Sequence, residues 1–155
     1  MLSIIDYREE FFVRLYRCWL IVSILGLNRK DENVLSIKKA AFFDFLVRNP
    51  KSFHEFLVKF ERLSEETPYK EVLYSSNIGY GEFQNYQDFL KSVLVLENEG
   101  YLKITRTEDD FLVATTNKKF AESTIPPQTW QINIRLLKPL VSKSLNVLYK
   151  GVLNK

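Results

Sequence analysis

The stretch that decides the fold is LENEGYLKITRTEDDFLVATT, residues 96–116. The period of its apolar residues changes at Gly100, and glycine is common just after the end of a helix. Residues 101–105 and 111–115 are two short runs suited to strands, separated by a turn rich in Asp and Thr. The stretch therefore predicts a helix followed by an antiparallel β-hairpin.

Three helices are expected upstream of this hairpin. Residues 82–99 form the helix that leads into it, because their apolar side chains follow the helical period. An earlier helix, residues 35–47, is broken at Asn49-Pro50, since the residue before proline avoids the helical region. Between them, SFHEFLVKFERL (residues 52–63) reads as a helix that Ser52 caps, with Glu55 completing a capping box.

The N-terminal segment, residues 6–25, predicts a further helix, for which Gly26 is a suitable stop. Four of its polar side chains fall on one narrow stripe: Asp6, Glu10, Arg14 and Arg17. Nearly all its other side chains are apolar, so the helix must be covered on most sides. Either the core of the chain itself or a partner subunit can provide that cover.

The remaining segments carry weaker signals. Residues 64–81 read as a loop, and Asn117 can cap a short helix that runs to Ala121. Residues 129–152 are amphipathic with Pro139 in their middle. An interior proline costs a helix roughly 3 kcal/mol, so a kink or two separate helices are expected there.

The order helix, helix, helix, strand, strand is that of a winged helix. We therefore expect a mostly α-helical fold with a small β-hairpin, in a single domain spanning residues 1–155. Its parts would be an N-terminal helix within residues 1–30, a winged-helix core at residues 33–116, and C-terminal helices at residues 117–155.

The sequence offers no evident catalytic or metal site. Its one histidine, His54, and its one cysteine, Cys18, lie on different predicted helices, and two such residues cannot supply a four-ligand zinc site. A Cys–His pair is conceivable, but a helical histidine is more often solvated or packed. No phosphate-binding glycine motif occurs. We expect a protein that is not an enzyme and holds no cofactor.

The expected location is the cytoplasm. A single cysteine cannot form an internal disulfide, which favours a reducing compartment. Acidic residues precede the first apolar run, whereas a secretory leader needs basic ones. The longest apolar stretch, residues 18–27, is shorter than the roughly 18 residues of a membrane span, so no membrane association is expected.

A winged helix that reads DNA needs cationic and amide side chains on the helix before its hairpin. Here that helix carries Glu82, Asp88, Glu97 and Glu99 against Lys91. DNA would repel such a helix. Its amides, Gln84, Asn85 and Gln87, lack cationic neighbours, and the tip of the hairpin is acidic as well. We expect the wing to be architectural.

Positive charge gathers at the C-terminal end of the chain instead. After Thr116 there are seven basic residues and one acidic residue, Glu122: the bases are Lys118, Lys119, Arg135, Lys138, Lys143, Lys150 and Lys155. These charges either keep a C-terminal helix soluble or face phosphates or an acidic partner. Any nucleic-acid contact should be non-specific and made by Arg135, Lys138, Lys143 and Lys150.

Two apolar helix faces are candidates for binding another protein, because aromatic and leucine-rich surfaces commonly anchor interfaces. The predicted partner-binding residues are Phe11, Leu15 and Trp19 of the N-terminal helix and Leu136, Leu140 and Leu148 of the C-terminal segment.

Two stretches support a family resemblance: FFDFLVRNP (residues 42–50), and FLKSVLVLENEGYLKI (residues 89–104), in which a leucine-periodic helix runs through glycine into a strand. Over residues 35–150 the chain resembles the small middle component of bacterial ABC-three-component systems, including the small subunit of Lamassu-type antiviral systems. The resemblance implies a winged-helix core between extra helices.

It also implies a non-catalytic adaptor in anti-phage or anti-plasmid defence. Such an adaptor works beside an SMC-like ABC ATPase and a nuclease-type effector, in a complex associated with DNA. The main alternative is a stand-alone winged-helix transcription regulator, which the acidic helix before the hairpin disfavours. An adaptor of a toxin–antitoxin or phage-encoded system is a third interpretation.

Overall fold

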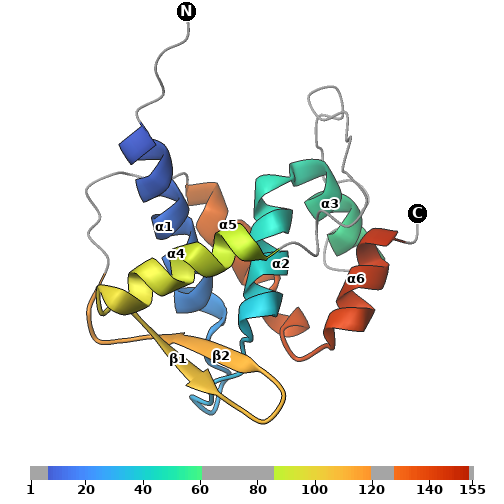
Figure 1. Cartoon of the computed structure of the whole chain (residues 1–155). Coiled ribbons are helices and arrows are strands. Elements are labelled where there is room, and N and C mark those ends of the chain that lie inside the picture. Colours follow the sequence, from blue (N-terminus) through green and yellow to red (C-terminus); the bar gives the residue numbers. More distant parts are fainter. Residues whose placement is uncertain (1–6, 61–85, 120–127, 154–155) are drawn as a thin grey trace, which may run out of the picture.

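A computed structural model of the chain describes residues 7–60, 86–119 and 128–153 (Figure 1). Over these residues the fold is mostly helical, with six α-helices and one two-stranded antiparallel hairpin. The elements in chain order are α1 (Tyr7–Leu25), α2 (Ile37–Arg48), α3 (Pro50–Lys59), α4 (Gln87–Asn98), β1 (Leu102–Arg106), β2 (Phe111–Thr115), α5 (Gln128–Leu136), the 3-10 turn η3 (Lys138–Leu140) and α6 (Leu145–Leu153). The predicted loop at 64–81, and Asp6, Glu82, Gln84 and Asn85, lie outside the described residues.

Helix α1 is the centre of the fold. Helices α2, α4 and α5 and strand β2 all pack against it (Figure 1). The chain itself thereby buries most of its apolar surface: Leu15, Tyr16, Cys18, Leu20, Ile21, Val22 and Leu25. Each fully buried Leu or Ile contributes about 1.5–3 kcal/mol. The chain's own core therefore supplies most of the cover that the sequence requires for this helix.

The end of α1 at Gly26 is confirmed. The Gly26 N–H closes the last turn on the Val22 carbonyl at 2.8 Å. A Cβ at position 26 would lie 2.5 Å from that same carbonyl oxygen, so no larger residue fits without a shift. The following loop is held by the Asn28 side chain, whose oxygen accepts from the N–H groups of Lys30 and Glu32.

Helix α2 begins two residues later than predicted. Ser36 is its N-cap, and the Ser36 hydroxyl accepts a 3.0 Å hydrogen bond from the Lys39 N–H. The helix ends at Arg48, and Asn49 breaks the chain's direction as predicted.

The predicted start of α3 was wrong. The helix begins at Pro50, and Ser52 is buried inside its first turn, where it cannot act as the cap. Proline suits the first helical position because its missing N–H would have no helical acceptor there. The capping-box pattern at Ser52 and Glu55 is therefore coincidental.

The predicted hairpin after α4 is confirmed. Gly100 has a φ of +86°, a left-handed conformation that favours glycine. The strands pair with Leu102 opposite Thr115 and Arg106 opposite Phe111. β1 is shifted by one residue from the predicted 101–105, because the Tyr101 N–H returns to the Leu96 carbonyl and completes the helix cap.

Strand β2 also has a partner on its other edge. The Val113 N–H donates to the Leu35 carbonyl at 2.9 Å, and Ser36 forms an isolated antiparallel bridge with Leu112. The extended residues just before α2 thus lie along β2. This contact ties the hairpin to the helical core and was not predicted from the sequence.

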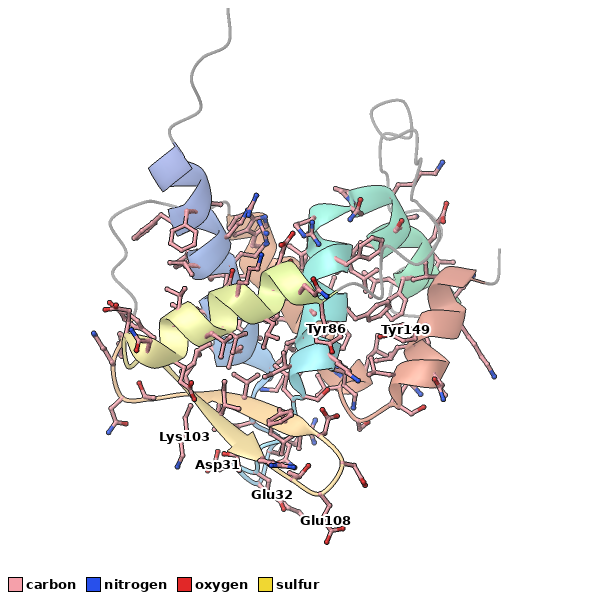
Figure 2. All side chains as sticks on the ribbon, viewed as in Figure 1. Asp31, Glu32, Tyr86, Lys103, Glu108 and Tyr149 are labelled. Atoms are coloured by element: carbon pink, nitrogen blue, oxygen red, sulfur yellow. The ribbon has the colours of Figure 1, made fainter. Side chains whose placement is uncertain are left out.

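The C-terminal segment divides at Pro139, as predicted, into α5, η3 and α6. Helix α6 packs against α3, and its Tyr149 ring meets Phe42 of α2 edge-on at 5.3 Å between centroids. Burial raises the pKa of Tyr149, and neighbouring Tyr86 at the start of α4 adds to the effect (Figure 2). The described residues that follow Asn117, up to 119, are not helical, so no short helix starts there.

Candidate interaction surfaces

The two residues considered for nucleophilic chemistry lie on different helices. Cys18 is buried in α1, and His54 is half-buried on α3. Burial raises the pKa of the Cys18 thiol well above its ordinary range, and the Asp44 carboxylate raises it further, against the opposing charge of Arg17. The thiolate is the nucleophile, and burial disfavours that form of Cys18. Within the described ranges, no three His, Cys, Asp or Glu side chains gather as metal ligands.

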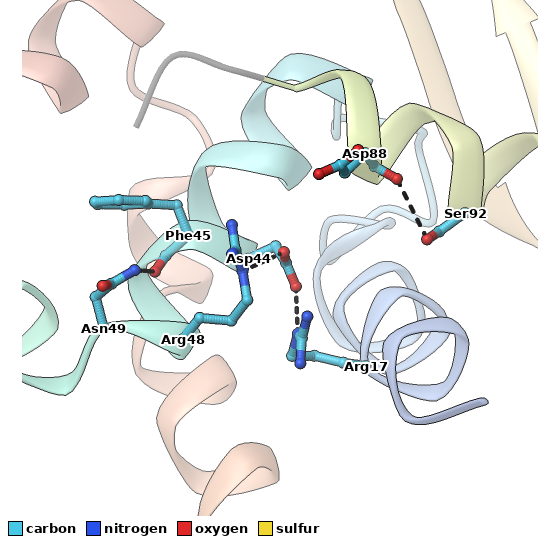
Figure 3. A network of polar contacts seen from close by, with 7 residues as sticks. All are labelled: Arg17, Asp44, Phe45, Arg48, Asn49, Asp88 and Ser92. Atoms are coloured by element: carbon cyan, nitrogen blue, oxygen red, sulfur yellow. Dashed lines mark hydrogen bonds and ion pairs between the residues drawn. The ribbon is translucent and has the colours of Figure 1, made fainter. Parts of the chain in front are cut away.

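An ion network around Asp44 joins helices α1 and α2 (Figure 3). Asp44 of α2 accepts hydrogen bonds from Arg17 of α1 and, at 2.9 Å, from Arg48 one turn further along α2. The Arg17 guanidinium also lies 5.6 Å from the ring centroid of Trp130 on α5. The sequence pattern placed Arg17 on the narrow polar stripe of the N-terminal helix. Only the spacing of four between Asp44 and Arg48 signalled part of this network.

The three partner-binding residues predicted on α1 differ from one another in how exposed they are. Phe11 is 47% exposed, and its neighbour Val13 is 37% exposed. Trp19 is half-buried. Leu15 is buried in the chain's own core, and therefore offers no free surface in this conformation. The exposed apolar surface of α1 is its first part, Phe11 and Val13.

The partner-binding residues predicted in the C-terminal segment are mostly buried. Leu140 and Leu148 are fully buried, and only Leu136 remains half-exposed. The sequence placed them on one apolar side of a long amphipathic segment. Because Pro139 divides that segment, η3 and α6 turn those leucines inward instead. The exposed apolar residues of this region are Ile132 and Val147.

Helix α4 presents an outward side that is acidic with an apolar centre. Its exposed residues are Gln87, Asp88, Lys91, Leu94, Glu97, Asn98 and Glu99, and Leu94 is 48% exposed. Two of the acids lie at the C-terminal end, where the helix dipole disfavours negative charge by about 0.3–1 kcal/mol each. Lys118 Nζ offsets part of this by donating to the Glu99 carbonyl at 2.8 Å.

The hairpin turn is polar and well ordered by local bonds. The Thr107 hydroxyl accepts from the Asp110 N–H at 3.0 Å, and the Thr107 N–H donates to the Asp110 carbonyl at 2.8 Å. Lys103 lies on β1, and Glu108 projects from the turn (Figure 2). The Arg106 guanidinium covers the ring of exposed Phe111 at 6.0 Å. The tip therefore combines acids with one cation held over an aromatic ring.

The basic residues predicted to contact nucleic acid are spread over three elements. Arg135 lies in the last turn of α5, Lys138 begins η3, and Lys150 lies in the last turn of α6; all three are exposed. Lys143 is half-buried between η3 and α6, with its Nζ 5.7 Å from the ring centroid of Phe60. That contact brings Lys143 beside the end of α3.

Comparisons of the chain with protein-family profiles, curated proteins and solved structures found no match. Across the residues whose placement is described, no helix is both long enough and apolar enough to cross a membrane.

Proposed function

We propose that this chain is the winged-helix adaptor subunit of a bacterial SMC-like ABC ATPase complex. It would be non-catalytic and would act in anti-phage or anti-plasmid defence, with a nuclease-type effector as a further subunit. The identity of these partners rests on the resemblance of residues 35–150 to the middle component of ABC-three-component systems. The chain's own surfaces support the narrower part of the proposal, which is a protein-binding role.

The winged-helix part is supported by the surroundings of β2. Its hairpin partner β1 lies on one edge, and the extended residues at Leu35 and Ser36 lie on the other. A strand between the first two helices that pairs with the returning strand of the wing is a feature of winged helices. On that basis α1, α2 and α4 would be the three core helices and α3 an insertion, whereas the sequence pattern placed the N-terminal helix outside the core at residues 33–116.

The observation that carries the protein-binding role is the outward side of α4. In a DNA-reading winged helix this side would face phosphates, yet it carries Asp88, Glu97 and Glu99 against Lys91 alone. Leu94 is exposed at its centre. An exposed apolar residue among charged ones suits contact with another protein better than contact with a polyanion.

The alternative is a stand-alone winged-helix DNA-binding transcription regulator. One observation favours it: Gln87, Lys91 and Asn98 are exposed along α4 and have side chains able to read base edges. Replacing all three with alanine would abolish sequence-specific binding by such a regulator. The adaptor would keep its partners after the same change.

The start of α1 is the second surface that supports an adaptor. Phe11 and Val13 are exposed, and half-buried Trp19 lies further along the same helix. With Leu15, Leu140 and Leu148 inside the core, Phe11 is the aromatic anchor that remains available among the predicted residues. The test is co-expression with the neighbouring genes: an adaptor co-purifies with the ATPase subunit, whereas a regulator purifies alone.

A further inference from the structure

The C-terminal elements and α3 together carry an unbalanced positive charge. Over residues 50–60 and 128–153 the only acidic residue is Glu55. Three lysines on α3, on α6 and on the turn that leads into α6 form what we call the basic surface: Lys59, Lys143 and Lys150. Lys59 and Lys150 are exposed, and Lys143 is half-buried.

The fold brings Lys59 to this set, although it is far from the others in sequence. Helix α6 packs along α3 (Figure 1). Lys143 Nζ lies over the ring of Phe60, the residue that follows Lys59. Lys150 is an exposed residue of α6, the helix that begins just after Lys143. The end of α3 and the outer side of α6 thus present lysines from two distant parts of the chain.

These charges are not neutralised inside the described part of the chain. None of the three lysines forms an ion pair there, whereas Arg17 and Arg48 share the carboxylate of Asp44. Like charges gathered on one surface repel each other, and this repulsion is relieved when a polyanion binds.

We propose that the basic surface binds the phosphate backbone of a duplex nucleic acid without reading its sequence. Lysine ammonium groups are compact point charges, which suit phosphates spaced along a backbone. The described aromatic side chains of α3, α5 and α6 are all buried or half-buried, so they offer no exposed ring on which single-stranded bases could stack. Contacts to phosphates position a protein but carry no sequence information.

This inference does not depend on the adaptor role. It adds a nucleic-acid contact on a face other than α4, and it can be measured with the isolated chain.

The experiment measures binding of fluorescent duplex DNA and duplex RNA by anisotropy at several salt concentrations. The wild-type chain is compared with a variant carrying Lys59→Gln, Lys143→Gln and Lys150→Gln. The matched control carries Lys91→Gln, Lys103→Gln and Arg106→Gln, three exposed cations on α4 and β1. Both variants lose three positive charges. Any difference in their affinity for the duplex is therefore due to where on the surface the charges were removed.

The wild-type chain should bind a duplex of random sequence, and its affinity should fall as salt rises. Each lost phosphate contact reduces the slope of log K against log salt by about 0.9, so the basic-surface variant should lose up to about 2.7. The control should keep the wild-type slope. No binding at low salt, an equal loss in the control, or equally tight binding of polyglutamate would overturn the proposal.

Discussion

Lys39 Nζ donates a 2.7 Å hydrogen bond to the carbonyl oxygen of Val141, which lies 102 residues further along the chain. The bond joins the first turn of α2 to the bend between η3 and α6. Lys39 is half-buried, and burial lowers its pKa, while the Asp110 carboxylate at the hairpin turn partly opposes the shift. One lysine thus lies where the core, the hairpin and the C-terminal elements meet.

The substitution Lys39→Met keeps an aliphatic side chain of similar length but removes the donor to the Val141 carbonyl. It should therefore destabilise the fold by about 1–2 kcal/mol. The pH dependence has a definite sign. The folded state binds this proton less readily than the unfolded chain, so the contribution of Lys39 to stability grows as pH rises from the lowered folded pKa toward the ordinary lysine value.

Urea unfolding of both proteins across the alkaline range measures this directly. The stability difference between wild type and Lys39→Met should widen with rising pH. If the unfolding free energies of the two proteins instead change in parallel with pH, the fold does not desolvate the Lys39 ammonium group.

The ion network at Asp44 predicts an asymmetric response to mutation. Asp44→Asn leaves the largely buried Arg17 guanidinium without its counter-charge, which should cost about 3 kcal/mol. Arg48→Gln removes only the more exposed partner, and should cost less than about 1 kcal/mol. Urea unfolding at neutral pH compares the two, and equal costs would contradict this division of roles.

A double substitution separates charge from packing at the same place. Arg17→Met combined with Asp44→Leu removes both charges and keeps apolar volume. Because a buried ion pair is often replaceable by packed apolar residues, this variant should be more stable than Asp44→Asn alone.

The surroundings of Cys18 and His54 predict that neither is needed for chemistry. Replacing both with alanine should leave partner binding and activity in cells unchanged, apart from a packing loss at Cys18 of about 1–2 kcal/mol. A separate measurement is the reaction of the wild-type thiol with a thiol reagent, which should proceed only as fast as the protein opens. A correctly folded double variant that has lost function would contradict the adaptor proposal.

Local signals in the sequence were sufficient for several elements. The change of period at Gly100 located the hairpin, and Pro139 located the break between α5 and α6, because both effects act within a few residues. The start of α3 was misplaced since two local signals competed, and proline at the first helical position prevailed over the capping pattern at Ser52.

Such local signals did not predict the tertiary contacts. Periodicity identified Leu140 and Leu148 as apolar, but it could not tell a core from an interface, and the structure buries both. The pairing of Arg17 with Asp44 joins residues on separate helices and left no mark in local spacing. The contact of Leu35 with β2 depends on how the hairpin folds back, which no short pattern encodes.

The most direct test of the adaptor proposal uses two phenylalanines with nearly equal exposure. Phe11 on α1 is 47% exposed and Phe111 on the hairpin is 49% exposed. Each is changed to glutamate, co-expressed with the neighbouring genes and run on a sizing column. A lost aromatic anchor typically costs at least about 2 kcal/mol, or about thirtyfold in affinity. The wild type and Phe111→Glu should elute with the ATPase subunit, and Phe11→Glu should elute alone. A wild-type chain that elutes as a monomer without its neighbours would contradict the account.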